Sequence, residues 1–143
     1  LDAERPAGGT GIARSLERMA EGLRRRGMVV VVSDLLDDPA AVPRGLSLLR
    51  LKGNDVIVFH VLDFAELDFP FDGLARMEDV ETDRNVTVEC EVVKDPYLAL
   101  LKEFLDTTRE RCRSQGIDYV LLSTAEPLDR GLVRFLAWRA KAK

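Results

Sequence analysis

Residues 28–34 read Met28-Val29-Val30-Val31-Val32-Ser33-Asp34, an unbroken apolar run that ends at a carboxylate. A run without a polar face is typical of a strand covered on both sides, as in a parallel sheet between layers of helices. Open α/β folds place their ligand sites where such strands end. The stretch therefore predicts a core strand of an α/β domain, with a candidate site at Asp34.

The segments on both sides of this strand continue the α/β pattern. An apolar helical stripe precedes it and is predicted to end at Gly27, and a second helix is expected from Asp38 to Gly53. Residues 55–62 have the pattern of a second buried strand, which ends at Asp63. Alternating helices and strands with short connections predict parallel crossovers.

The middle of the chain departs from this pattern. Residues 77–81 and 86–92 resemble two hairpin arms, and in the second arm apolar and polar side chains alternate. We expect an antiparallel hairpin insertion within residues 74–92, after an irregular segment over residues 64–73. The next helix is predicted to run from Asp95 to Gly116.

The C-terminal part returns to the parallel arrangement. A third parallel strand is predicted at residues 117–122, followed by Ser123 and Thr124, and a last helix from about Pro127. We therefore expect residues 1–143 to form a single unit with an α/β fold. Its architecture would be a partial doubly wound parallel sheet with helices on both faces and an antiparallel hairpin insertion.

The composition argues against several classes of function. The net charge is −4, and the densest basic run, Arg24–Arg26, is placed where cations complement a helix dipole, so we expect no nucleic-acid partner. No apolar stretch approaches the ~20 residues of a membrane helix, so we expect no membrane insertion by this segment. Cys90 and Cys112 lack metal or redox spacing, which favours reduced thiols and a cytoplasmic location.

Polar side chains follow the predicted strand ends. With parallel crossovers, Asp34, Asp63 and Thr124 share one edge of the sheet, and Thr10, which precedes the first helix, belongs at the same edge. A hydroxyl and a carboxylate suit a hard cation such as Mg²⁺, which keeps several of its waters. We therefore predict Thr10 and Asp34 as metal ligands, with Asp37 as a weaker candidate behind them.

Each of these residues also has a purely structural interpretation. Thr10 suits a helix N-cap, and Asp37 and Asp63 suit caps or turns. His60, the single histidine, lies inside an apolar strand, which favours a hydrogen-bonded core residue over a metal ligand. With one histidine and no reactive serine or cysteine motif, a nucleophile–base pair has little to build on, and we predict no catalytic residue.

A set of short motifs recurs in order along the chain. They are Arg25-Arg26-Gly27-Met28, Ser33-Asp34-Leu35-Leu36-Asp37-Asp38, residues 55–63, Glu66-Leu67, Phe69-Pro70-Phe71, Glu78-Asp79-Val80-Glu81-Thr82, Gly116-Ile117-Asp118-Tyr119 and Glu126-Pro127-Leu128-Asp129. In these motifs the chain resembles, nearly end to end, the C-terminal part of family 58 of the bacterial domains of unknown function.

This resemblance implies a von Willebrand factor A-like domain, encoded beside MoxR-type AAA+ ATPases. Such domains carry a metal-ion-dependent adhesion site built from an Asp-x-Ser-x-Ser loop, a loop with a Thr and a loop with an Asp. By position Thr10 matches the second loop and Asp34 the third, whereas the first motif does not occur in this chain. The resemblance thus implies Mg²⁺ or Mn²⁺ in the full-length protein, with no metal expected in this portion.

The missing motif has a consequence for residues 28–34. The chain begins with Leu1 and not with Met, and we expect it to be the C-terminal portion of a longer von Willebrand factor A-like domain. The upstream strand would pair beside residues 28–34, and without it this strand becomes an exposed edge, which is an association hazard. We therefore expect a homodimer or a higher oligomer.

Two functions compete at this stage. The favoured one is a non-enzymatic protein-interaction adaptor, assisted by a divalent cation and working with a MoxR-type AAA+ ATPase. The alternative is a Mg²⁺-dependent phosphoryl-transfer or phospho-acceptor signalling domain that uses Asp34. A phospho-acceptor domain would want a Lys at a later strand end, where this chain has Ser123 and Thr124. A third interpretation is a structural scaffold.

Overall fold

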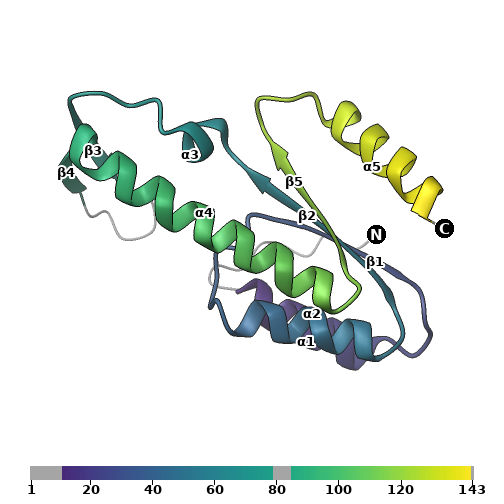
Figure 1. The fold of residues 1–143 in the computed structure, drawn as a ribbon. Coiled ribbons are helices and arrows are strands. Elements are labelled where there is room, and N and C mark those ends of the chain that lie inside the picture. The colour runs from purple at the N-terminus through teal and green to yellow at the C-terminus, as the bar shows by residue number, and fades with distance from the viewer. Residues whose placement is uncertain (1–10, 79–84, 143) are drawn as a thin grey trace, which may run out of the picture. The chain divides into compact units, whose positions relative to one another are not determined.

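The computed structural model describes residues 11–78 and 85–142 (Figure 1). The chain divides into two compact units: the first unit comprises Leu1–His60 with Glu110–Leu121, and the second unit comprises Val61–Arg109 with Leu122–Lys143. The elements, in order, are α1 (Ile12–Gly22), β1 (Met28–Ser33), α2 (Ala41–Leu51), β2 (Asp55–Leu62), α3 (Phe64–Asp68), β3 (Leu74–Glu78), β4 (Asn85–Glu89), α4 (Cys90–Ser114), β5 (Asp118–Ser123) and α5 (Leu128–Ala142). That the whole chain forms one domain stays a prediction.

The strands form two sheets, and the predicted α/β fold class is confirmed. Three strands form a sheet in the order β1-β2-β5, in which β1 and β2 are parallel, with Met28 opposite Asp55 and Ser33 opposite His60. Helices flank this sheet. A separate antiparallel sheet pairs β3 with β4. Strand β3 begins three residues before the predicted first arm, and β4 ends three residues before the predicted end of the second arm.

The prediction that strand β1 is covered on both faces is wrong. Val29 and Val31 are buried, whereas Met28, Val30 and Val32 are exposed. Successive side chains of a strand point to opposite faces, so Val29 and Val31 lie on the covered face of β1, and the other three lie on a face that stays open to solvent. The strand covered on both faces is β2, whose residues 56–60 are all buried.

The core of the first unit lies between two helices and the buried face of β1. Helices α1 and α2 lie side by side (Figure 1), and Gly45 allows their close approach, since a Cβ there would lie 2.7 Å from Cβ of Leu16. Leu46 and Leu49 on α2 are buried in this core. A small residue at the crossing thus lets the two backbones pack closely.

Helix α1 ends at Gly22, five residues before the predicted C-cap at Gly27. The N–H of Gly27 is instead bonded to Oδ1 of Asn54 at 3.1 Å, while Nδ2 of Asn54 donates to the carbonyl of Leu49 at 2.9 Å. The buried Asn54 therefore fixes the start of β1 against the end of α2. Because of this bond to a residue 27 positions away, Gly27 precedes strand β1 and does not cap helix α1. The sequence near Gly27 gives no sign of this long-range bond.

In the second unit, α4 begins at Cys90, five residues before the predicted start at Asp95. The N–H of Cys90 donates to the carbonyl of Gly73 at 2.8 Å, and the N–H of Gly73 donates to the Glu91 carboxylate at 2.9 Å. These two bonds fix the first turn of α4 beside β3 and β4 (Figure 1). The alternating apolar residues therefore form a strand only as far as Glu89, and from Cys90 on they belong to helix α4.

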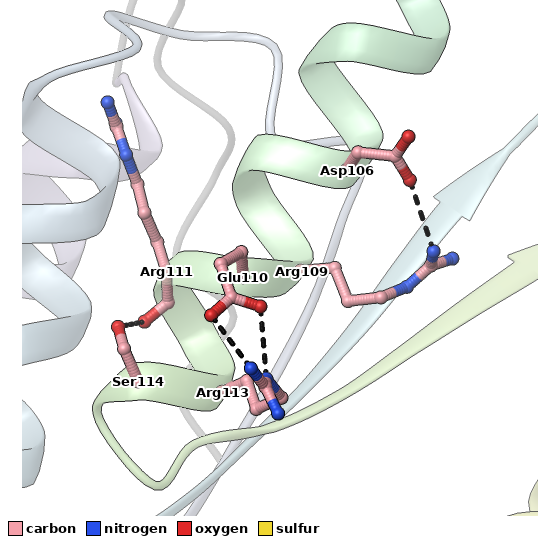
Figure 2. A network of polar contacts seen from close by, with 6 residues as sticks. All are labelled: Asp106, Arg109, Glu110, Arg111, Arg113 and Ser114. Atoms are coloured by element: carbon pink, nitrogen blue, oxygen red, sulfur yellow. Dashed lines mark hydrogen bonds and ion pairs between the residues drawn. The ribbon is translucent and has the colours of Figure 1, made fainter.

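Exposed ion pairs lie on the C-terminal part of α4. Figure 2 shows Arg109 with Asp106 at 3.3 Å in the second unit, and Arg113 with Glu110 at 3.0 Å in the first unit. The Arg113 guanidinium holds the pKa of Glu110 below its usual range through hydrogen bonding and charge. All four side chains are exposed, and such pairs contribute little to stability. None of the helices in the described part of the chain is long and apolar enough to cross a membrane.

Candidate functional site

The loop that follows β1 is fastened at three points within the first unit. Nε2 of His60 lies 2.7 Å from the carbonyl oxygen of Asp34. The carboxylate of Asp37 accepts a hydrogen bond from the N–H of Ala13 at 3.0 Å. Arg111 donates to the carbonyl of Pro39 at 2.9 Å. Residues 34–39 are therefore held in a defined conformation, although most of them are exposed.

Asp34 forms a tight side-chain turn at the end of β1. Its Oδ1 accepts from the N–H of Leu36 at 3.1 Å and from the Ser33 hydroxyl at 3.3 Å. Between them Leu35 has a φ of 56°, a left-handed conformation that is costly for a side chain of this size, and it is buried. The buried Leu35 side chain anchors the turn, which leaves the carboxylate of Asp34 exposed at the sheet edge.

His60 links this loop to the core. Its side chain is completely buried, with Nδ1 2.7 Å from the hydroxyl of Tyr119 and Nε2 bonded to the Asp34 carbonyl. A carbonyl oxygen can only accept, so Nε2 carries the proton, and in neutral His60 the Tyr119 hydroxyl donates to Nδ1. His60 is thus the hydrogen-bonded core residue that the sequence favoured, and it positions the backbone of Asp34.

Asp37 caps helix α1 from a distance. Its two carboxylate oxygens accept from the N–H of Ala13 and, at 2.7 Å, from the N–H of Asp38. The bond from Ala13, followed by that from Asp38, holds the pKa of Asp37 below its usual range. This contact places the start of α1 beside the end of β1, as the crossover pattern predicted. The N-cap position is Gly11, and the predicted ligand and cap Thr10 lies outside the described residues.

A second polar pair in the second unit joins the ends of β2 and β5. The hydroxyl of Thr124 donates to Oδ2 of Asp63 at 2.8 Å and accepts from the N–H of Phe64 at 3.2 Å. Asp63 also caps α3 through the N–H of Ala65, and Glu66 bonds back to the N–H of Asp63. The Ala65 bond, then the Thr124 bond, lowers the pKa of Asp63. The capping interpretation of Asp63 is therefore confirmed.

These arrangements limit what the strand ends can bind. In residues 11–78 and 85–142, no three His, Cys, Asp or Glu side chains form a group that could hold a metal ion. Asp34 would supply one carboxylate, and Asp37 is already used as a cap. Metal binding by Thr10 and Asp34 stays a prediction.

A groove in the second unit is the feature that the sequence did not reveal. It has a volume of about 500 Å³ and lies between the segment after β2, strand β4 and the start of α4. Phe69 is buried, with ring centroids 5.3 Å from Phe71 and 5.3 Å from Tyr97. The lining is mostly apolar: Ala65, Glu66, Phe69, Phe71, Val88, Val93 and Tyr97. The Phe69-Pro70-Phe71 cluster was the available signal, but the sequence predicted only an irregular segment over residues 64–73.

One carboxylate stands in the wall of this groove. Burial, and then the charge of Glu66, raise the pKa of Tyr97, so the tyrosine stays neutral while the wall is negative. Residues 63–73 carry Asp63, Glu66, Asp68 and Asp72 without any Lys or Arg. The groove therefore combines an aromatic floor with an acidic surrounding.

Comparison with known proteins identifies the family of this chain. A family model described as "Protein of unknown function DUF58" matches residues 1–103, and the chain belongs to this family. An uncharacterised protein of Mycobacterium avium is 29% identical over 132 residues, which cover 91% of this chain and 76% of that protein. No solved structure matches significantly. The predicted family is thereby confirmed.

Proposed function

We propose that this chain is a non-enzymatic protein-interaction domain whose contact surface includes the groove of the second unit. The observation that carries this proposal is the pairing of an aromatic floor, Phe69, Phe71 and Tyr97, with the Glu66 carboxylate. Large apolar side chains supply most of the affinity in protein interfaces, and charges at the rim select the partner. The site suits a protein segment that places a large apolar side chain next to Lys or Arg.

The groove is preformed, which favours binding. The bonds that join Gly73 to Cys90 and Glu91 hold one wall, and the capping box of Asp63 and Glu66 holds another. A preorganised site loses little conformational entropy when a partner enters. Binding to such a site follows from shape and charge and requires no chemical step.

Calorimetry with a model peptide tests this proposal. The probe is a twelve-residue peptide of Leu, Phe and Lys, compared with the same peptide carrying Glu in place of Lys. We expect only the basic peptide to bind, and Val93→Lys, in the groove, to weaken binding at least tenfold. Val92→Lys is the matched control, because Val92 is exposed and does not line the groove. Equal effects of the two variants would contradict the proposal.

We further propose that a divalent cation assists the full-length protein through Thr10 and Asp34. The exposed carboxylate of Asp34 and its fastened loop support this role. Titration of Mg²⁺ or Mn²⁺ into a chain that includes upstream residues should show binding that Asp34→Ala removes and Asp72→Ala keeps. Labelling of Asp34 by acetyl phosphate would favour the alternative, a phospho-acceptor or phosphoryl-transfer domain.

The partner that we propose is a MoxR-type AAA+ ATPase, as the family resemblance implies, and the place is the cytoplasm. The free, buried thiols of Cys90 and Cys112 support a reducing compartment. Co-purification of the two proteins should depend on Mg²⁺ and on Asp34. Capture that resists a chelator and Asp34→Ala would refute the cation-assisted form of the proposal.

A further inference from the structure

Positive charge gathers in the first unit where the parallel strands begin. Arg24–Arg26 lie in the connection from α1 to β1, and Arg50 and Lys52 lie at the turn from α2 to β2. All five residues are exposed, and we call them the basic edge. Helix α1 ends at Gly22 and has no basic residue in its last turn, so the helix dipole does not account for Arg24–Arg26.

Two arginines of the basic edge lie against neighbouring turns. A Cβ on Gly53 would lie 2.8 Å from Nε of Arg26, and a Cβ on Gly116 would lie 3.5 Å from Nη2 of Arg50. Nη1 of Arg50 also donates to the carbonyl of Asn54 at 3.2 Å. These contacts position both guanidinium groups before a partner arrives, which lowers the entropy cost of binding.

The charges of the basic edge are not neutralised within the described part of the chain. None of its five cations forms an ion pair with a described residue. Arg113, three residues before Gly116, differs because it is paired with Glu110 (Figure 2). Asp55 and Asp118, which begin β2 and β5, are only partly exposed. Excess positive charge therefore remains at this edge of a chain whose net charge is −4.

An apolar side chain stands among these cations. Leu51, between Arg50 and Lys52 in the chain, is 82% exposed. Single exposed apolar side chains are common on protein surfaces. Here cations flank the leucine on both sides, so one bound segment can contact both kinds of group.

We propose that the basic edge binds an acidic segment of a partner protein, one that carries an apolar side chain among Asp and Glu residues. Carboxylates form paired hydrogen bonds with guanidinium groups, and four of the five cations are arginines. Asp34, Asp37 and Asp38, at the other end of β1, repel such a segment, so the charge asymmetry of the first unit steers it to the basic edge. This contact is independent of the groove in the second unit.

Two other anionic partners fit the basic edge less well. A bilayer is flat and extended, so it would also meet the carboxylates of Asp55, Asp118 and Glu110, whereas a narrow segment contacts the cations alone. Single-stranded nucleic acid binds through aromatic stacking as well as charge, and residues 23–27, 50–54 and 113–117 contain no aromatic side chain. Charge and side-chain type therefore favour a protein segment.

Calorimetry with acidic peptides tests the proposal. The probe is a twelve-residue peptide of Asp and Glu with a central Leu, and the control peptide has Asn and Gln in place of Asp and Glu. We expect only the acidic peptide to bind, with an affinity that falls as salt is added. Arg25→Glu with Lys52→Glu should weaken binding about tenfold, since each reversal removes a charged contact. The matched control is Arg18→Glu with Arg44→Glu, which changes the net charge equally at exposed positions on α1 and α2 outside the basic edge.

A second variant tests the apolar contact, and circular dichroism verifies that each variant folds. Leu51→Ser should weaken binding of the acidic peptide about threefold and leave unchanged the binding of the same peptide with Ser in place of Leu. Equal effects on the two peptides would exclude Leu51 from the contact. Absence of binding by the acidic peptide, or equal losses from the two charge-reversed pairs, overturns the proposal. Tighter binding to phosphatidylglycerol vesicles or to a single-stranded RNA than to the peptide overturns it as well.

Discussion

The two units differ in how they use their apolar residues. Most of the buried apolar side chains in the described part of the chain belong to the first unit, where the buried Asn54 and His60 each make two hydrogen bonds. The second unit keeps only a small buried set, whereas exposed large apolar side chains occur in both units, such as Leu51 at 82% exposed in the first and Leu74 at 77% exposed in the second.

This difference suggests different roles: the first unit positions the loop that carries Asp34, and the second unit presents an apolar groove. In the first unit, dense burial fixes the loop after β1 and the exposed Asp34 at its start. In the second unit, the aromatic groups of Phe69 and Tyr97 line a surface groove. Exposed contiguous apolar surface is typical of interaction sites. The comparison therefore places the more densely packed core in the first unit and the aromatic groove in the second.

The largest expected effect is on the rate at which the two cysteine thiols are chemically labelled. Each unit holds one cysteine, so the two rates compare the units. Cys112 reports on the first unit and Cys90 on the second, and both are buried. In single-cysteine variants we expect labelling about 10³-fold slower than in the unfolded chain. Cys90 should react at least tenfold faster than Cys112, since the second unit buries fewer apolar side chains and should open more often.

The labelling rate of each folded variant is divided by the labelling rate of the same variant in denaturant. This ratio removes the intrinsic reactivity of each thiol and measures how strongly the fold protects it. Protection of Cys90 equal to or above that of Cys112 would break the comparison between the units.

The next effect concerns the two polar links. His60→Ala should lower the free energy of unfolding by about 3 kcal/mol, because it empties a buried site and takes a hydrogen-bond partner from both the Asp34 carbonyl and Tyr119. Thr124→Val in the second unit should lower the free energy of unfolding by much less, since its bond to Asp63 is exposed. Urea unfolding measures both changes, and equal losses would contradict the difference.

Glycine substitutions probe helix packing in each unit. Gly45→Ala should cost about 1–3 kcal/mol, because the new methyl group meets Cβ of Leu16, which cannot rotate away. Gly131→Ala should cost less, since the atom it meets is the terminal methyl of Leu122. Gly22→Ala, with open space around it, is the control and should be neutral or stabilising by up to ~1 kcal/mol. Thermal unfolding ranks the three variants.

The smallest effect is the response to acid. The folded state lowers the pKa of Asp37 in the first unit and of Asp63 in the second. Each carboxylate therefore contributes stability that is present above its unfolded pKa, near 3.8, and is lost as the pH falls through the folded pKa. Asp37→Asn and Asp63→Asn should each flatten the fall of stability below pH 4. Unchanged slopes in both would exclude these caps as acid-sensitive groups.

The sequence predicted several elements well. The alternation of helices and parallel strands, the buried run of β2 and the structural role of His60 follow from local apolar patterns and from a lone polar residue in an apolar strand. The errors lie where a residue distant in the chain fixes the end of a helix. Gly27 bonds to Asn54, and Cys90 bonds to Gly73, so α1 ends early and α4 starts early.

The candidate sites divide in the same way. Asp34 was found because a carboxylate after a parallel strand lies at the sheet edge whatever the packing. The cap that Asp37 gives to Ala13 was missed, because 24 residues separate the two, and local capping patterns cover only a few residues. The groove was missed because its wall combines the segment after β2 with strand β4 and the start of α4.

The sequence by itself determined the family, the order of the elements apart from the short helix α3, which was expected to be irregular, and the ends of β1 and β2, since each depends on neighbouring residues. Only the tertiary structure decided which face of β1 is open, which residue caps α1, and where Phe69, Val93 and Tyr97 meet. Burial and long-range hydrogen bonds depend on which segments pack together, and a residue's near neighbours in the chain do not carry that information.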